Sequence, residues 1–546
     1  MSDQSRDERS RTVLILLKRL RSKFAMMPRR NRGTFVTVID ATPKPASASG
    51  PLPAQSTGQH ANWLRANWGL LLALAALIAV ILLPTPEGLS VAGQRMLAIL
   101  AFAVIVWMTE ALDYAVSGIV IAALMAFLLG LSPNPANTKV LLGTGAGLGL
   151  AFSGFANTAL ALVASALFLA AAMTVTGLDR RIALTILSRV GGEVHHVVVG
   201  AILVGFVMAF LVPSTTARVA CLVPITLGII AAFGVNRKGA FAGMLMITTV
   251  QTASIWNVGI KTAAAQNMVA VGFIEKTLQK SITWLDWFIA AAPFGILMSI
   301  ALYFVMTRMM RPEVTDIPGG REAIRTSLAE LGPMKTSEKK LLAISLALLG
   351  FWATEGVLHS LDTSSTTIAA VGLMFLPGIG IMTWKDAQPR IPWGTIVLFG
   401  IGISVGTALL QTKGASWLAD LAVVEFGLKN ATALFILAVL TLFLTLIHLG
   451  FASATALASA MIPIVIAVLQ GVATPGLNIV GMTMLLQFVV SFGFILVVNA
   501  PQNMVGYGTE TFAARDFVRT GLVLTVIAVA LVMLLGATYW RWLGYV

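Results

Sequence analysis

Long runs without charge dominate this sequence and leave few folds open to it. Asn67 to Pro84 and Trp287 to Met306 are two of several mostly apolar runs that reach about 18 residues or more, the length that spans a bilayer as an α-helix. Only 11% of the 546 residues are charged, against roughly 25% in soluble domains. The runs are continuous and do not alternate as the strands of a membrane barrel must. The sequence therefore predicts an all-α polytopic membrane protein, without strands.

Residues suited to enzymatic chemistry are sparse in the chain. Cys221 is the single cysteine, which excludes an intrachain disulfide and a cysteine metal cluster. The five histidines are scattered, and only His195 and His196 are neighbours. No HExxH motif, Walker loop or GxSxG motif with partners is present. We therefore expect no enzyme and no cofactor.

A basic tail precedes the apolar runs. Residues 1–60 carry eleven Lys and Arg but four acids, a surplus of seven within the net charge of +14. Such a block beside a membrane is typical of the cytoplasmic side and of contact with anionic lipid. Nucleic-acid binding is the alternative, but with so many spans we expect the bilayer as partner and no nucleic acid. Residues 12–27 suggest an interfacial amphipathic helix, and residues 41–58 a disordered linker.

About eleven transmembrane helices account for most of the apolar runs. They are expected near residues 66–84, 94–114, 115–133, 148–178, 240–272, 284–307, 338–358, 366–383, 392–424, 476–508 and 517–540. Stretches 196–230 and 431–470 are too long for one span and are interrupted near the middle by Pro, Ser, Thr and Ala. They predict two re-entrant helical hairpins. With the N-terminus in the cytoplasm and the C-terminus outside, most basic loops lie in the cytoplasm, as the positive-inside rule requires.

Four short strings of the sequence occur twice. "AAQNMVAVG" at Ala264 returns as "APQNMVGYG" at Ala500, 236 residues later. "WMTEAL" returns as "WATEGV", "STTARVACLVPI" returns as "SATALASAMIPI", and Gly177 matches Gly414. Alanine-rich membrane segments can resemble one another by chance, but four matches in one order at nearly one offset favour an internal repeat.

The repeat divides the chain into segments. An extra first transmembrane helix in 61–92 precedes a first repeat, 93–310, and a cytoplasmic loop, 311–337, leads to a second repeat, 338–546. Each repeat holds five crossings, and because five is odd the second repeat is inverted. Inverted repeats with interrupted helices are typical of secondary transporters, whose substrate sites lie near the bilayer midplane.

These strings, with "WMTEALDYAVSG", "PWGTIVLFGIGISVGTAL" and "ARDFVRTGL", resemble the divalent anion:sodium symporter family over about residues 90–546. That family includes sodium–dicarboxylate cotransporters and 2-oxoglutarate/malate translocators. The resemblance implies a homodimer in the plasma (inner) membrane and an elevator-type movement. It also implies that a Ser-Asn-Thr motif at each hairpin tip meets the substrate, with sodium ions beside the tips.

The resemblance assigns a set of binding residues. The substrate-binding candidates are Ser214, Thr215, Thr216, Ser453, Ala454, Thr455, Gln502 and Asn503. Sodium is the candidate coupling ion, at Ser214, Ser453 and neighbouring backbone carbonyls. Both motifs lack the family's Asn: Thr215 offers one donor in its place and Ala454 none. The alternative for each hydroxyl is a bond to its own helix backbone.

Polar residues at the interrupted spans are candidates for binding a cation or replacing one. Gln266 and Asn267 carry amide oxygens that suit sodium, with interhelical bonding as the alternative. Arg218 follows the first motif. Lys261 and His448 lie near where the resemblance places sodium and could be fixed cations that replace it, which would favour anion exchange over symport. Lys261 could instead extend to the outer surface. Glu110 and Glu355, at matching places, are expected to cap or pair at helix ends.

The sequence predicts a secondary active transporter of small divalent anions of the di- or tricarboxylate type. Sodium-coupled symport and anion exchange both remain open. Sulfate or a sulfonate is the alternative substrate, because the lost Asn side chains weaken the case for a carboxylate. An anion channel is the alternative of another class, although no charged ring or filter sequence is visible. A membrane enzyme acting on lipid would need an acid–base pair that the sequence lacks.

Overall fold

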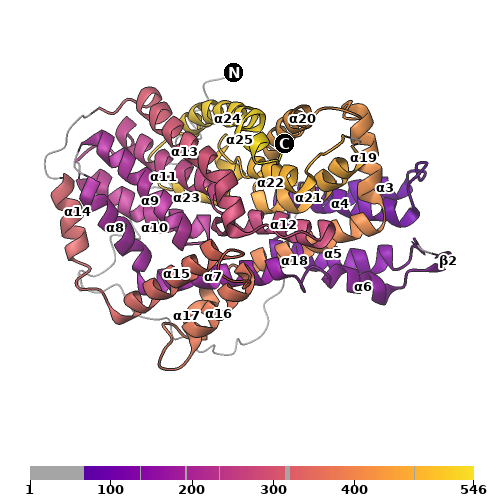
Figure 1. The fold of residues 1–546 in the computed structure, drawn as a ribbon, viewed down its shortest axis with the longest axis horizontal. Coiled ribbons are helices and arrows are strands. Elements are labelled where there is room, and N and C mark those ends of the chain that lie inside the picture. The colour runs from indigo at the N-terminus through magenta and orange to yellow at the C-terminus, as the bar shows by residue number, and fades with distance from the viewer. Residues whose placement is uncertain (1–66, 136, 191–192, 233, 314–319, 473) are drawn as a thin grey trace, which may run out of the picture. The chain divides into compact units, whose positions relative to one another are not determined.

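The computed structural model describes residues 67–546 apart from 136, 191–192, 233, 314–319 and 473 (Figure 1). The predictions for the basic tail 1–60, with its amphipathic helix and linker, lie outside the described residues. So do residues 61–66 of the predicted first helix.

The apolar runs of the first half form helices, although residues 153–157 interrupt the span predicted at 148–178. In chain order they are α3 (Trp68–Leu82), α4 (Val91–Thr109), α5 (Tyr114–Leu124), the π-helix η1 (Met125–Leu129), α6 (Thr144–Phe152), α7 (Thr158–Thr176), α8 (Leu178–Val190), α9 (Val194–Leu211), α10 (Thr215–Ala232), α11 (Ala240–Gly259), η2 (Lys261–Ala263), α12 (Ala265–Phe273), η3 (Ile274–Leu278) and α13 (Trp284–Met309). The expectation of no strands missed one small antiparallel hairpin, β1 (Pro133–Asn134) with β2 (Asn137–Leu141). Every residue of β2 is exposed, so hydropathy carried no signal for it.

The second half follows the same plan. Its elements are α14 (Gly320–Ala329), α15 (Thr336–Thr354), α16 (Thr363–Phe375), α17 (Trp384–Ala387), η4 (Gln388–Arg390), α18 (Trp393–Gln411), α19 (Gly414–Glu425), α20 (Ala433–His448), α21 (Ala454–Gly471), α22 (Ile479–Val490), η5 (Val497–Asn499), α23 (Pro501–Tyr507), α24 (Ala514–Ala537) and α25 (Tyr539–Trp542). Within the described ranges, 8 helices are long and apolar enough to cross a membrane, and five shorter ones are also apolar. The protein is thus an all-α polytopic membrane protein; the number of crossings stays a prediction.

Large apolar side chains lie exposed on several helices, which a membrane environment explains. Ile119 on α5 is 70% exposed, Val424 on α19 is 72% exposed and Val526 on α24 is 68% exposed. In water such side chains would lose the free energy of burial, whereas hydrocarbon tails solvate them. The charged residues instead concentrate near helix ends and loops, with a few buried exceptions described below.

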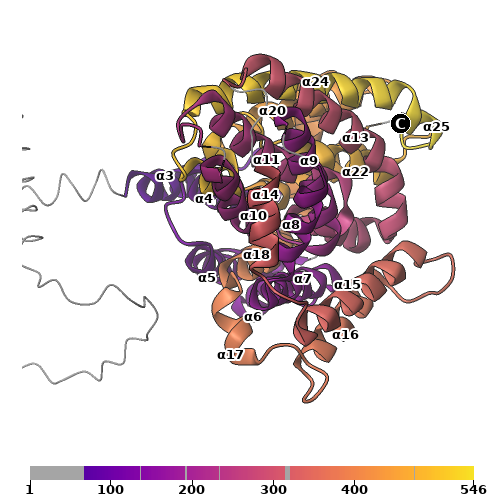
Figure 2. The same ribbon diagram turned by 90° about the vertical axis from the view of Figure 1, so that its left-hand side faces the viewer.

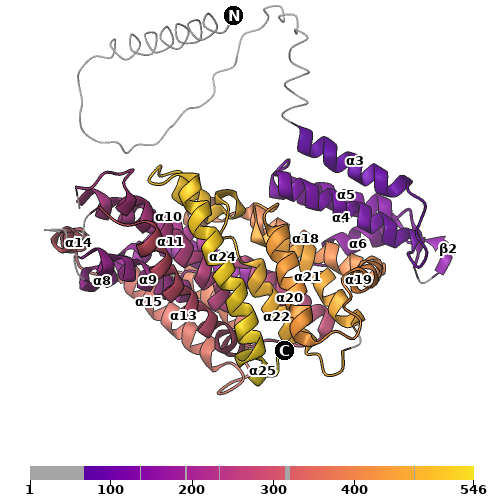
Figure 3. The same cartoon turned by 90° about the horizontal axis from the view of Figure 1, so that it is seen from above.

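Two helical hairpins and two broken helices repeat between the halves. The hairpins are α9–α10 and α20–α21, and the broken helices are α11–α12 and α22–α23. The second part of each broken helix packs against the hairpin of the other half: α12 contacts α21, and α23 contacts α10 (Figure 1). The last helix of the second half, α24, lies along α13 of the first half (Figure 3). The halves are therefore interleaved rather than side by side.

The repeated strings have matching backbone conformations. Ala264 (φ −150, ψ 144) and Ala500 (φ −154, ψ 141) are extended residues that precede α12 and α23. The indole N–H of Trp107 donates to the hydroxyl of Ser117 on the next helix, and the indole N–H of Trp352 donates to that of Thr367 in the same way. The left-handed residue after α7 is Gly177, and its counterpart after α18 is Lys413, 236 residues later, rather than Gly414. The correspondence there is shifted by one residue from the sequence match.

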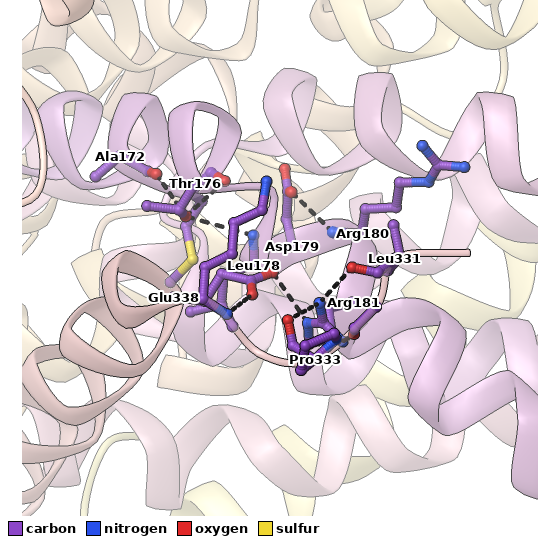
Figure 4. Close-up of polar contacts among 12 residues, drawn as sticks. Ala172, Thr176, Leu178, Asp179, Arg180, Arg181, Leu331, Pro333 and Glu338 are labelled. Carbon is purple, nitrogen blue, oxygen red and sulfur yellow. Dashed lines mark hydrogen bonds and ion pairs between the residues drawn. The ribbon is translucent and has the colours of Figure 1, made fainter. Parts of the chain in front are cut away.

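Another group of helices joins both halves and packs against the second hairpin through α18 and α21. Here α7 packs against α16, and α18 packs against α5 (Figure 2). At the start of α8, Arg181 ties this helix to the beginning of α15 (Figure 4). Its Nε lies 2.9 Å from Glu338 Oε1, and its Nη atoms donate to the carbonyls of Leu331, Gly332 and Pro333. A planar guanidinium with five donors can satisfy all of these acceptors at once.

Candidate functional site

Both hairpin tips and both helix breaks line one cavity. Its volume is about 540 Å³, within the roughly 300–1,000 Å³ usual for small-molecule sites. Of the residues predicted from sequence, those that line it are Ser214, Thr215, Thr216, Ser453, Ala454, Thr455, Gln266 and Gln502. Asn267, Asn503, Lys261 and His448 are not among the lining residues.

Elements outside the repeated motifs complete the walls. The α7 face contributes Leu167, Ala170, Ala171 and Thr174, and the α17–α18 corner contributes Arg390, Pro392, Thr395 and Leu398. Tyr114, at the start of α5, also lines the cavity and interacts with Ser453 through its hydroxyl. Sequence reasoning missed these residues because they lie in no repeated string and come together only in the fold.

The motif serines begin the second helix of each hairpin. Ser214 Oγ accepts from the backbone N–H of Ala217 at 3.4 Å, and Ser453 Oγ accepts from that of Ala456 at 3.3 Å. These are the bonds of an N-cap residue. Each serine hydroxyl therefore does bond to its own helix backbone, as the alternative reading expected, but only as an acceptor. The hydroxyl protons remain able to donate, and the N-termini of α10 and α21 favour negative charge nearby.

The glutamines at the two breaks reach across to the opposite half. Gln266 Nε2 donates to Ser491 Oγ at 3.4 Å, and Gln502 Nε2 donates to Ser254 Oγ at 3.2 Å. Ser491 is the C-cap of α22 and Ser254 lies within α11, so each glutamine bonds to the broken helix of the other repeat and the two contacts are reciprocal. A two-fold relation between the repeats accounts for this exchange of partners.

The asparagines next to them brace the breaks. Asn267 Nδ2 donates to the carbonyls ten and seven residues before it, at 2.7 and 3.1 Å. Asn503 Nδ2 makes the same two bonds, at 2.8 and 3.2 Å. Both side chains are fully buried. They donate to carbonyls that the interruption of α11 and α22 leaves without helical partners. Neither side chain lines the cavity, so neither has direct access to a ligand there.

Arg218 fills the space between the first hairpin tip and the first break. Its side chain is fully buried. Nη1 donates to the carbonyls of Val212 at 2.8 Å and Ala263 at 3.0 Å, and Nη2 donates to Asn257 Oδ1 at 2.6 Å. Asn257 Oδ1 also accepts from Thr215 Oγ1 at 2.6 Å. No acid pairs with Arg218 among the described residues, so its charge is compensated by carbonyl dipoles alone.

Asn499 takes the corresponding position in the second half. Its Nδ2 donates to the carbonyls of His448 at 2.8 Å and Phe451 at 3.0 Å. Phe451 matches Val212 and Asn499 matches Ala263 at the repeat offsets. In both halves, therefore, a protein N–H group occupies the carbonyl cluster between tip and break. The ring nitrogens of His448 are buried without hydrogen-bond partners among the described residues.

Lys261 lies away from the cavity. It is 3% exposed, and its Nζ donates to the carbonyl of Ile282 at 2.6 Å, in the connection before α13. Glu355 caps helix starts, since it accepts from the backbone N–H groups of Trp284 at 3.4 Å and Thr363 at 3.2 Å. Glu110 is the left-handed residue at the end of α4. The described residues hold no cluster of three or more His, Cys, Asp and Glu suited to a metal ion.

The cavity lining is polar but almost without charge. Arg390 is the only Lys, Arg, Asp or Glu among the described residues that line it. The remaining polar groups are hydroxyls and amides, which are uncharged hydrogen-bond donors. A lining with donors, one cation and no carboxylate suits an anionic ligand and disfavours a cationic one.

Sequence comparisons find known proteins that are similar to nearly the whole described chain. The family described as "Sodium:sulfate symporter transmembrane region" matches residues 64–546. A "Membrane protein" of Cupriavidus necator is 56% identical over 484 residues, covering 88% of this chain and 94% of that protein.

Two more distant relatives have functional names. The "Sodium-dependent dicarboxylate transporter SdcS" of Staphylococcus saprophyticus is 25% identical, with coverage of 85% and 90%. The "L-tartrate/succinate antiporter" of Escherichia coli is 24% identical, with coverage of 86% and 97%. The relatives thus include a sodium-dependent protein and an exchanger.

Proposed function

The chain belongs to the sodium:sulfate symporter transmembrane family, and from this membership we propose that it is a secondary active transporter that exchanges small divalent anions. The family and its named relatives are transporters of anions and not enzymes. One observation carries the proposal: two hairpin tips and two helix breaks line one cavity, and its described lining residues offer donors and no carboxylate. A dicarboxylate is the proposed substrate class, because the relatives named above transport dicarboxylates.

Exchange is favoured over sodium symport by the groups that fill the two carbonyl clusters. Backbone carbonyls beside a hairpin tip are ligands that suit a hard cation. Here the guanidinium of Arg218 uses those of the first half, and the amide of Asn499 uses those of the second half. An anion carrier with a permanent internal cation needs no sodium to offset substrate charge. The fixed cation that we propose is therefore Arg218. It takes the place of Lys261, the cation expected from the sequence, because the Lys261 ammonium is bonded to the carbonyl of Ile282.

The proposal includes an elevator-type movement in a homodimer of the inner membrane, with the N-terminus in the cytoplasm and the C-terminus outside. The composition of the cavity walls supports the movement. One wall comes from the hairpins and broken helices, and the other from α5, α7 and the α17–α18 corner. Sliding of the first set along the second would carry the tips across the membrane with the substrate attached.

Counterflow in proteoliposomes tests the proposed function. The purified full-length protein is reconstituted, and uptake of labelled succinate or sulfate is measured with and without unlabelled anion inside, each with and without a sodium gradient. Exchange predicts that uptake requires unlabelled anion inside the liposomes and that its rate does not change with the sodium gradient. Uptake into empty liposomes driven by sodium would replace exchange by symport, and conductance without saturation would indicate a channel. Preference for sulfate over succinate would move the substrate to the alternative class.

A further inference from the structure

Among the described residues, Arg390 is the one cationic side chain that lines the cavity, and the motifs of the repeat do not include it. It is the last residue of η4, where the chain turns from α17 into α18, and it is exposed. The hairpins and broken helices contribute none of this corner. Its position on the opposite wall gives it a role separate from those of the two tips.

The corner that holds Arg390 is rigid. Pro389 and Pro392 flank it and restrict the backbone. Trp384 and Trp393 lie 6.1 Å apart between ring centroids, and Phe168 of α7 lies 5.6 Å from Trp384. This aromatic cluster attaches the corner to α7. The guanidinium is therefore presented at the cavity from a fixed base.

Most donors of Arg390 are available for a ligand. Its Nη1 donates to the carbonyl of Asp386, which uses one of five N–H groups. The neighbouring carboxylate of Asp386 accepts instead from the backbone N–H of Thr383 at 2.9 Å and from its hydroxyl at 2.7 Å. No ion pair involves Arg390 among the described residues. An exposed Arg with free donors at the edge of a donor-lined cavity can bind a carboxylate or sulfate with two parallel bonds.

We propose that Arg390 binds one charged group of a dianionic substrate while the hairpin tips bind the other. The inference rests on the proposed function and adds a specificity-determining residue to it. Because Arg390 belongs to the wall opposite the tips, it contacts the substrate only when the tips stand at its level. It therefore selects dianions over monoanions on one side of the membrane.

Exchange kinetics of matched variants test this role. Arg390→Gln, Arg390→Lys and the control Lys385→Gln are reconstituted, and KM is measured for succinate and for monomethyl succinate, which lacks the second charge. Lys385 is exposed on α17 and does not line the cavity. Arg390→Gln should raise the KM for succinate about tenfold or more and that for the monoester less than about twofold. Arg390→Lys should recover part of the loss, and Lys385→Gln should behave as wild type.

The outcomes separate this inference from the proposed function. An unchanged succinate KM in Arg390→Gln, with normal exchange by wild type, overturns the role of Arg390 alone. An equal rise for succinate and the monoester also overturns it, because selection by charge would be absent. Failure of wild type to exchange succinate or sulfate overturns the proposed function instead. Thermal unfolding in detergent identifies a misfolded variant, and then Arg390→Lys against wild type decides.

Discussion

Replacement of Arg218 by Ala is the most direct test of sodium-free exchange. The change removes the internal cation and leaves the carbonyls of Val212 and Ala263 without the donors that Arg218 provides. A buried acceptor without a partner costs about 1–3 kcal/mol. Loss of the partners of both carbonyls therefore costs about 2–6 kcal/mol in the stability of the hairpin tip and helix break beside the cavity. If about 3 kcal/mol of that is expressed in transport, exchange in sodium-free medium falls by about two orders of magnitude.

Sodium should partly rescue the Arg218→Ala variant. The vacated cluster retains the two carbonyls and Asn257 Oδ1, which are oxygen ligands suited to a hard cation. The assay measures succinate counterflow over a sodium series, with choline as the replacing cation. Arg218→Lys keeps a charge but not the fork of donors, and Arg189→Ala removes an exposed charge of α8 as a control.

Two results would refute this reasoning. Sodium-free exchange that survives in Arg218→Ala would mean that the guanidinium is structural and not a replacement for the coupling ion. Sodium-dependent exchange by wild type would mean that a cation site exists elsewhere. A variant that unfolds in detergent is distinguished by its thermal profile, and the Lys variant then supplies the comparison.

Three further variants test the site and the fold. Ala454→Asn adds an amide donor to the cavity lining and should lower the KM for succinate about fivefold. A raised KM in counterflow would mean that the substrate occupies the space beside Ala454 that the longer Asn side chain would fill. Arg181→Ala breaks a mostly buried ion pair with Glu338 and should destabilise the protein by about 3 kcal/mol, which lowers the unfolding temperature in detergent. An unchanged unfolding temperature would mean that this ion pair contributes little to stability. Gly177→Ala forces a side chain into a left-handed conformation with φ +76 and should cost about 1–2 kcal/mol. Gly177→Asn should cost less, because Asn tolerates this conformation better; equal losses for the two variants would refute left-handed strain as the cause.

Local patterns in the sequence were enough for the helices and the repeat. Hydropathy over about 18 residues reports a membrane helix wherever it occurs, so α4, α7, α13 and α24 could be placed before any tertiary information. The interrupted stretches and the strings at Ala264 and Ala500 located the hairpins and breaks in the same way. The hairpin β1–β2 escaped because short exposed strands have no such pattern.

Contiguous residues alone indicate a helical membrane protein and predict its duplicated halves, because hydropathy and repeated strings can be recognised without any tertiary contact. Which polar groups face the cavity depends on how distant helices pack together. Lys261 and Arg218 are both buried cations near a break, but one bonds to Ile282 and the other to the tip and break together. The direction of a side chain depends on which helix packs beside it, and that partner is distant in the sequence. Arg390 belongs to the cavity for the same reason.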